Sequence, residues 1–184
     1  MKKLNFRYSI MKKIILATFI ITVIIISCKS SNTNNSKKLI INFESKSNSK
    51  VTGTATFIEK KGKVFLTAKL SGLTAGIHAI HIHEKSDCTA ADGSSAGGHW
   101  NPTFKKHGKW GDTEYHKGDI GNFIADKNGN GSIEFSTTEW CMDCNDATKN
   151  IVGKGLIVHQ GTDDFTSQPA GNAGARVACG AVIK

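Results

Sequence analysis

The chain has 184 residues, of which 39% are hydrophobic and 21% are charged, and it contains only two prolines. This composition supports one sizeable buried core and excludes a disordered or collagen-like chain. The formal net charge is +9, but without residues 1–27 the chain has 19 basic and 15 acidic residues, a balance of +4. A surplus this small argues against nucleic acid as a partner.

The N-terminal segment is expected to be an export signal followed by a tether. Two lysines precede thirteen residues, 14–26, that contain nothing more polar than threonine, and such a stretch is too short to span a bilayer comfortably. The signal is complete whether translation starts at Met1 or at Met11. We predict three segments: a removed signal peptide at 1–27, a flexible tether at 28–38 and a folded domain at 39–184.

The expected cleavage site resembles the bacterial lipobox, in which a cysteine after a small residue is lipidated and becomes the new N-terminus. Here Ser27 precedes Cys28. A plain signal peptide and an uncleaved anchor are the alternatives, but the Ser/Asn/Lys-rich stretch that follows has the composition of a flexible linker. We therefore expect an exported lipoprotein, attached through Cys28 to a membrane of the bacterial cell envelope, in the periplasm or at the outer membrane.

From residue 39 onward the pattern predicts an all-β domain. Short stretches alternate apolar and polar residues, and Gly, Asn and Asp interrupt them every eight to twelve residues, which is typical of strands and turns. Hairpin turns are expected at Lys61–Gly62 and at 128–131, where residues tolerate positive φ. The segments that are expected to form strands and hairpins are 38–45, 51–60, 59–70, 118–136, 151–160 and 176–184.

Two long segments, 85–117 and 160–175, lack this alternation and are rich in Gly, Asp, Ser and Asn. Long irregular segments inside a compact domain are usually functional or disordered. The first segment contains three histidines, which favours a function.

The histidines suggest a metal site, since all seven lie after residue 77. His81 and His83 are two apart in an alternating stretch, so their rings project from the same face of a strand. His116 and Asp119 lie on either side of Gly118, and a tight turn there can aim both side chains at one point. A lone histidine is more often structural, which we expect for His78, but six further histidines and an aspartate favour a metal.

Six motifs, in this order, resemble those of the copper/zinc superoxide dismutase family: GIHAIHIHE (76–84), SAGGHWNP (95–102), KHG (106–108), HKGDIGN (116–122), VHQGTDD (158–164) and GNAGARVACG (171–180). The resemblance covers about 39–184. It implies an eight-stranded antiparallel Greek-key β-barrel, or flattened immunoglobulin-like sandwich, with two long functional loops. It also implies an enzyme that disproportionates superoxide to oxygen and hydrogen peroxide by cycling copper between Cu(II) and Cu(I), and that protects the cell envelope from oxidant.

The resemblance implies one copper and one zinc per subunit. The copper ligands would be His81, His83, His99 and His159. The zinc ligands would be His99, His107, His116 and Asp119, so that His99 bridges the two metals. His99 would also be catalytic, because it supplies one proton to the reduced superoxide. Four imidazoles suit copper in both oxidation states, and a carboxylate fits redox-inert zinc better than it fits Cu(I). Two flanking cations allow a bridging imidazole to lose both ring protons.

Three further roles are implied by the same resemblance. Asp163 would accept hydrogen bonds from the rings of His81 and His107, whereas the alternative is a loop aspartate in water. Arg176, the only arginine after Arg7, would guide superoxide to copper, because its always-charged guanidinium attracts a small anion; a surface salt bridge is the alternative. A disulfide would join Cys88 and Cys179.

Four cysteines remain after Cys28 is set aside, and an even number in an exported chain permits disulfides. Cys141 and Cys144, in the motif CMDC, are not part of the family pattern. We expect a local disulfide between them, with a redox-active or metal-binding pair as the alternative, because two cysteines do not complete a structural zinc site.

Two departures from the eukaryotic pattern affect partners. The stretch between His83 and Cys88 is short, and in the eukaryotic enzymes this segment contributes to dimerisation, so the subunit state, monomer or homodimer, stays open. Segment 160–175 contains no lysine, so steering of superoxide depends more on Arg176 and on the lysines at positions 105, 106 and 109 (Lys105, Lys106 and Lys109).

Two rival functions use the same fold. The first is a non-catalytic copper- or zinc-binding lipoprotein that stores or delivers metal. It predicts the loss of a copper ligand, of the bridging histidine or of the guiding arginine, and this sequence has lost none of them. The second is a structural envelope protein whose zinc site stabilises the fold while copper is never loaded.

Overall fold

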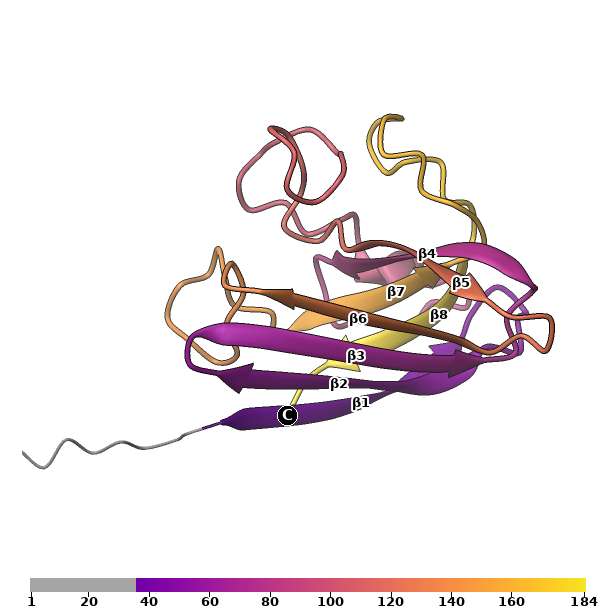
Figure 1. The fold of residues 1–184 in the computed structure, drawn as a ribbon, viewed down its shortest axis with the longest axis horizontal. Helices are drawn as coiled ribbons and strands as arrows, with labels where there is room; N and C mark the ends of the chain where they lie inside the picture. The colour runs from indigo at the N-terminus through magenta and orange to yellow at the C-terminus, as the bar shows by residue number, and fades with distance from the viewer. Residues whose placement is uncertain (1–35) are drawn as a thin grey trace, which may run out of the picture. The chain divides into compact units, whose positions relative to one another are not determined.

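The computed structural model describes residues 36–184 (Figure 1). The expected signal peptide, Cys28 and most of the expected tether lie outside the described residues. Within them, no helix is long and apolar enough to cross a membrane.

Eight antiparallel strands close into a barrel, with the hydrogen-bonded order β1-β2-β3-β6-β5-β4-β7-β8 and a final pairing of β8 with β1. The non-consecutive neighbours β3·β6 and β4·β7 give the barrel its crossovers. Every strand therefore has two neighbours, although β1 pairs with β8 only at Glu44 and Ser45 and β5 pairs with β6 only at Ala125. The closed order confirms the predicted all-β barrel. The strands are β1 (Lys37–Ser45), β2 (Thr52–Lys60), β3 (Lys63–Ser71), β4 (Gly76–His83), β5 (Gly121–Ala125), β6 (Gly131–Thr137), β7 (Lys154–His159) and β8 (Arg176–Val182).

Period-two alternation places the apolar residues of β3 inside the barrel. Val64, Leu66, Ala68 and Leu70 are buried, whereas the residues between them face outward. The β2–β3 turn has positive φ at Lys61 and Gly62, 52° and 72°, as a two-residue hairpin turn requires. In the β5–β6 turn, positive φ was expected within 128–131, and only Gly129 has it.

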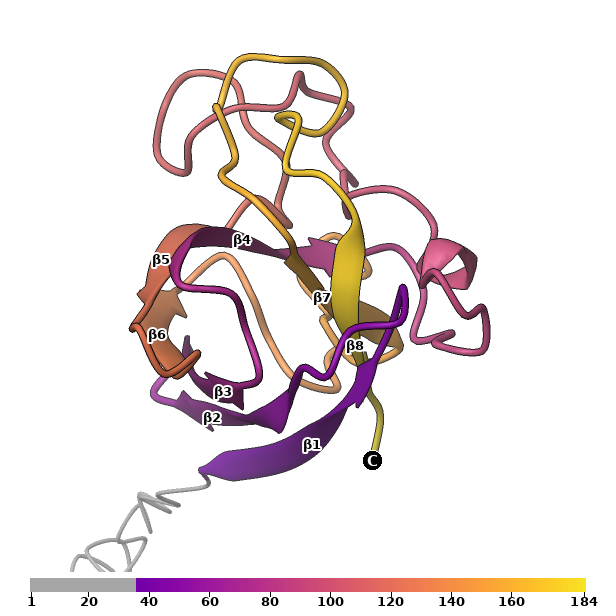
Figure 2. The same ribbon diagram turned by 90° about the vertical axis from the view of Figure 1, so that its right-hand side faces the viewer.

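Strand β4 differs from β3 because both of its faces are covered. Ile80 and Ile82 belong to the hydrophobic core, whereas His81 and His83 point the other way and are still 0% and 1% exposed. The cover comes from the loops that carry 84–120 and 160–175, which lie together on one side of the barrel in both views (Figures 1 and 2). The first of these loops contains a single short 3-10 turn, Ser94–Ala96. The two segments without alternation therefore lie over the histidines of β4.

A disulfide joins Cys88, in the loop after β4, to Cys179 on β8, and a second one joins Cys141 to Cys144 after β6. The first pair is separated by 91 residues and the second by 3. Both expected pairings are present in the structure.

Removing the long-range disulfide should destabilise the domain. We expect the double change Cys88→Ala and Cys179→Ala to lower the free energy of unfolding by about 2–5 kcal/mol, because closing a long loop restricts the unfolded chain most. Denaturant unfolding of the oxidised protein measures the loss. The matched control, Cys141→Ala with Cys144→Ala, opens a much shorter loop and should cost less; an equal loss in both variants would contradict the argument.

Candidate metal centre

Two groups of four buried side chains have potential ligand atoms that all lie within 4.8 Å of one another. Group A is His81, His83, His99 and His159. Group B is His99, His107, His116 and Asp119. The structure thus brings together all seven side chains for which the family resemblance implies metal binding, and His99 belongs to both groups.

Strands β4 and β7 bring three rings of group A together. They are antiparallel neighbours in which Ile80 is the register partner of Val158, so His159 follows directly after the residue opposite Ile80. His81 lies opposite Ile157 and His83 opposite Gly155, and their rings reach His159 through their side chains. The Nε2 atoms of His83 and His159 are 3.4 Å apart. His99 joins them from the loop through an isolated bridge to His83, and its ring centroid lies 4.1 Å from that of His81.

The loop after His99 folds around the carboxylate of Asp119 in group B. Asp119 Oδ1 lies 2.7 Å from Nδ1 of His99 and 3.3 Å from Nδ1 of His116, and Oδ2 lies 3.0 Å from Nδ1 of His107. The backbone N–H of His116 donates to Oδ2 at 2.8 Å. Gly118 allows this turn to lie against β4, because a Cβ there would be 2.1 Å from the carbonyl oxygen of Ile82.

Four buried ring nitrogens have no hydrogen-bond partner among the described residues: His81 Nδ1, His99 Nε2, His107 Nδ1 and His116 Nδ1. Buried polar atoms are nearly always paired, so four such atoms converging on two points indicate ligands for cations. His81 belongs to group A, His107 and His116 belong to group B, and His99 belongs to both. The donor sets, four nitrogens in one group and three nitrogens with one oxygen in the other, fit copper and zinc respectively.

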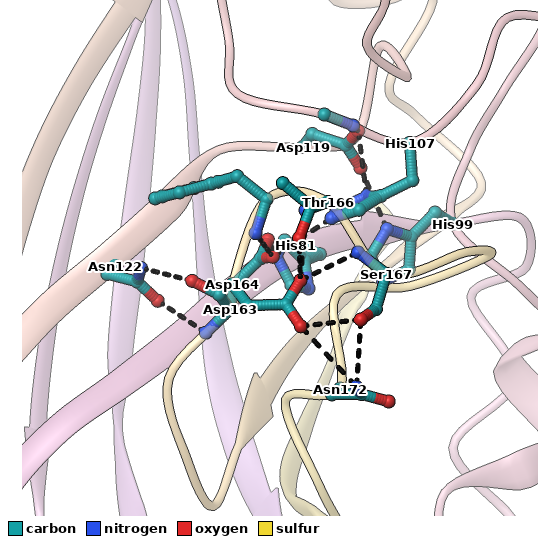
Figure 3. Close-up of polar contacts among 12 residues, drawn as sticks. His81, His99, His107, Asp119, Asn122, Asp163, Asp164, Thr166, Ser167 and Asn172 are labelled. Atoms are coloured by element: carbon teal, nitrogen blue, oxygen red, sulfur yellow. Dashed lines mark hydrogen bonds and ion pairs between the residues drawn. The ribbon is translucent and has the colours of Figure 1, made fainter.

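In His81, His83 and His107, one ring nitrogen bonds an acceptor outside the two groups. The other nitrogen of the ring is therefore the one that faces its group. Asp163 Oδ2 accepts from His81 Nε2 and Oδ1 accepts from His107 Nε2, both at 2.9 Å (Figure 3). His83 Nδ1 donates to the Gly97 carbonyl at 2.9 Å. Because a carboxylate or a carbonyl can only accept, these nitrogens carry the protons, and the lone pairs of His81 and His83 point into group A.

Asp163 is itself held firmly, since it is 1% exposed. The side chain of Asn122 accepts from its backbone N–H and donates to its carbonyl, both at 2.9 Å (Figure 3). Gly171 packs against the carboxylate so closely that a Cβ would lie 1.8 Å from Oδ1. Asp163 is therefore a rigid support that joins one ring of each group.

The charge states suit cation binding. Burial lowers the pKa of His99 to about 4, in spite of its hydrogen bond to Asp119. Burial also holds the pKa values of His83 and His159 well below the usual range. Burial would raise the pKa of Asp119, but the close rings of His107, His116 and His99 and the backbone N–H of His116 outweigh it and hold that pKa well below its usual range. Neutral imidazoles and an ionised carboxylate are the forms that bind metals.

His107 is the exception among the rings. Burial alone would lower its pKa, but the neighbouring carboxylate of Asp119 and the hydrogen bond to Asp163 raise it to about 9. A cation that binds Nδ1 of His107 therefore displaces a proton.

A cavity of about 520 Å³ opens beside group A, with His83, His99, His159 and Arg176 in its wall. The guanidinium of Arg176 donates to the carbonyls of Gly93 and Gly97, both at 2.7 Å. Arg176 is also the register partner of His159 across β7 and β8. The lining of this cavity does not include the lysines at 105, 106 and 109.

One side chain at this site carried no signal in the sequence. Gln168 accepts from the backbone N–H of His107 at 2.9 Å and donates to its carbonyl at 3.0 Å. It thus fixes the backbone of a group B residue from the second loop. His78, expected to be structural, lies outside both groups and bonds the carbonyls of His159 and Thr74.

Known proteins share this architecture. Residues 51–182 match the family described as copper/zinc superoxide dismutase (SODC). Superoxide dismutase [Cu-Zn] 2 of Aquifex aeolicus (strain VF5) is 34% identical over 166 residues, which cover 88% of this chain and 94% of that protein. The extracellular superoxide dismutase [Cu-Zn] of Brugia pahangi is 36% identical over 144 residues, covering 73% and 70%. The crystal structure of the clock protein EA4 aligns with a TM-score of 0.69 at 31% identity, covering 78% of this chain and 92% of that one.

The two groups of side chains and the closed barrel agree with these matches. The family model covers most of the described residues, and the alignment with the Aquifex relative covers nearly the whole of that protein. The chain belongs to the copper/zinc superoxide dismutase family, which uses copper and zinc to disproportionate superoxide.

Proposed function

We propose that group A binds copper, that group B binds zinc, and that His99 is the ligand common to both, with one ion of each metal per subunit. The observation that carries this assignment is the position of His99. Its Nε2 is buried and unpartnered in group A, while its Nδ1 lies 2.7 Å from Asp119 in group B. When bound, copper supplies one-electron redox chemistry and zinc supplies a fixed positive charge.

The protein's own side chains have three tasks in the reaction of two superoxide anions with two protons to oxygen and hydrogen peroxide. Asp163 and the Gly97 carbonyl orient the rings of His81 and His83. Arg176 presents a positive charge in the cavity wall. His99 also lines the cavity, so that a proton held on its ring is positioned for transfer to the reduced substrate.

Metal analysis combined with a dismutation assay tests the proposal. Purified protein loaded with both metals should contain one copper and one zinc per chain and should consume superoxide. Full copper occupancy without dismutation would instead favour the metal-storage rival. Protein that takes up zinc but never copper would favour the structural rival.

The effect of Arg176 should appear in the rate and not in the metal content. We expect Arg176→Ala to lower kcat/KM by about tenfold or more and to flatten its dependence on salt, because steering of an anion by charge is worth about 10- to 1,000-fold. Arg176→Lys keeps the charge and should recover part of the rate. Stopped-flow assays at several ionic strengths measure both quantities, and an unchanged salt dependence in Arg176→Ala would refute the steering role.

We infer that the mature protein is exported and attached to a membrane of the cell envelope through a lipid on Cys28. The support is the apolar segment 14–26, the lipobox-like Ser27-Cys28 and two disulfides, which are typical of exported proteins. A relative named extracellular also supports export. The mass of the N-terminal peptide, and the loss of membrane association in Cys28→Ser, test the anchor.

At this location the enzyme would protect the envelope, because superoxide is an anion and crosses membranes poorly. Cells that lack the protein should be more sensitive to superoxide generated outside them, and equally sensitive to superoxide generated inside. The enzyme would work there as a monomer or as a homodimer, and light scattering on the metal-loaded protein distinguishes these two states.

A further inference from the structure

A cluster of lysines lies at the end of the barrel where β1 begins. Lys37 pairs in register with Glu59, and Lys60 pairs with Lys63, so the start of β1 and the β2–β3 turn lie at the same end. Lys37 also forms an ion pair with Glu59 at 3.3 Å. Four further lysines have no ion pair among residues 36–184: Lys38, Lys60, Lys61 and Lys63.

Apolar side chains accompany these lysines on the outer face of β1, β2 and β3. Lys38, Ile58 and Phe65 form one register row across the three strands, and Phe65 is 43% exposed. Ile40, two residues after Lys38, is 56% exposed. The ammonium group of Lys63 lies 5.3 Å from the ring centroid of Phe65. We call this surface the basic face and define it by six residues: Lys38, Ile40, Ile58, Lys60, Lys63 and Phe65.

The basic face has few opposing charges. The outward register rows of this face contain one carboxylate, Glu134 on β6, in the row of Ile40 and Thr67. Scattered exposed apolar residues are ordinary on a protein surface. Exposed apolar residues surrounded by unpaired lysines are typical of surfaces that lie against anionic lipid, because lysines are attracted to the headgroups and apolar groups enter the interface.

The position of residue 37, where the barrel begins, indicates what covers the basic face. If Cys28 carries the lipid, only residues 28–36 separate it from β1, and nine residues span about 30 Å at most when fully extended. So short a tether keeps the nearest protein surface at a high effective concentration on the membrane. The surface nearest to residue 37 is the end that carries the lysine cluster.

We propose that the basic face docks the barrel on an anionic lipid surface. The choice of lipid as occupant rests on the proposed anchor at Cys28. Docking in this way leaves the metal centre open, because the loops 84–120 and 160–175 lie on the opposite side of the barrel from β1, β2 and β3 (Figures 1 and 2). The cavity beside group A then faces away from a negatively charged membrane that repels superoxide.

Vesicle binding tests the surface separately from the anchor. The metal-loaded chain from residue 28, which contains the whole closed barrel, is sedimented with vesicles of phosphatidylcholine alone or mixed with an equal part of phosphatidylglycerol. We expect binding only to the mixed vesicles and a fall in binding at high salt. The triple variant K38E, K60E, K63E should lose binding on the order of a hundredfold, since each lysine near the surface contributes roughly fivefold.

A control triple with the same change in net charge makes the result specific. Lys50, Lys85 and Lys127 are exposed and lie outside β1, β2 and β3, so K50E, K85E, K127E should keep most of the binding. An equal loss in both triples would mean that only net charge matters and would overturn the proposal. Phe65→Thr should weaken binding several-fold, whereas Ile124→Thr, which removes an exposed apolar residue on β5, should not.

Footprinting on the lipidated full-length protein shows the orientation directly. Acylation of the lysines at 38, 60 and 63 should slow when the protein is in mixed vesicles, while acylation of those at 85 and 127 should not change. Equal labelling of all five would refute the docking. Dismutase activity and the mass of the Cys28 peptide are measured on the same samples, so a failure of the enzyme assignment or of the anchor is distinguished from a failure of docking.

Discussion

Replacing His159 by alanine is expected to abolish dismutase activity while zinc is retained. His159 belongs only to group A, where its Nε2 lies 3.4 Å from that of His83. Its Nδ1 donates to the Gly174 carbonyl at 3.3 Å, so it has no bond to group B. The variant removes one of four nitrogens proposed for copper and leaves the three histidines and the aspartate of group B in place.

Metal content and superoxide consumption, measured on the same preparation, test this prediction. His116→Ala is the matched change in group B and should show the reverse metal pattern, with zinc lost and copper kept. Full dismutase activity in His159→Ala would refute the assignment of group A to copper. Loss of zinc together with copper in that variant would show that the two groups are not separable at His159.

Replacing Asp163 by alanine is expected to weaken both metal sites at once. Its two oxygens hold Nε2 of His81, in group A, and Nε2 of His107, in group B. Without that carboxylate both rings lose their orientation, and the raised pKa of His107 loses one of its causes. Losing such a support typically costs about 10- to 100-fold in metal affinity or activity, and here the loss should appear for copper and for zinc.

Competition with chelators measures the two affinities separately. The neighbouring change Asp164→Ala is the matched control, because the exposed side chain of Asp164 bonds within its own loop, to Ser167, Thr166 and Asn172. It should leave both affinities nearly unchanged. A loss confined to one metal in Asp163→Ala would contradict the role of Asp163 as a joint support.

Local pattern predicted the strands well because strand formation depends on neighbouring residues. The turn at Lys61–Gly62 is where it was expected, since few residues tolerate positive φ. Strand β1 begins at Lys37, so the last two residues of the segment that we predicted as tether pair with β2. The common face of His81 and His83 also followed from the period of a strand.

Other parts of the site could not be derived from spacing. His99 and His107 lie in an irregular segment with no period. The number of histidines favoured a metal there, but only the family resemblance assigned these two to particular sites. Gln168, which holds the backbone of His107, belongs to no motif. Its contact depends on how the second loop lies against the first, 61 residues earlier in the chain.

The sequence by itself determined which segments become strands, where the chain turns tightly and which residue types are available for metals, because backbone preferences and alternation act over a few neighbouring residues. Only the tertiary structure decided that β7 lies beside β4, that Asp163 holds one ring from each group, and which nitrogen of each ring faces inward. These features depend on contacts between residues far apart in the chain, as between His81 and Asp163, 82 positions apart. Such contacts form only when the barrel closes and the two loops fold over its wall.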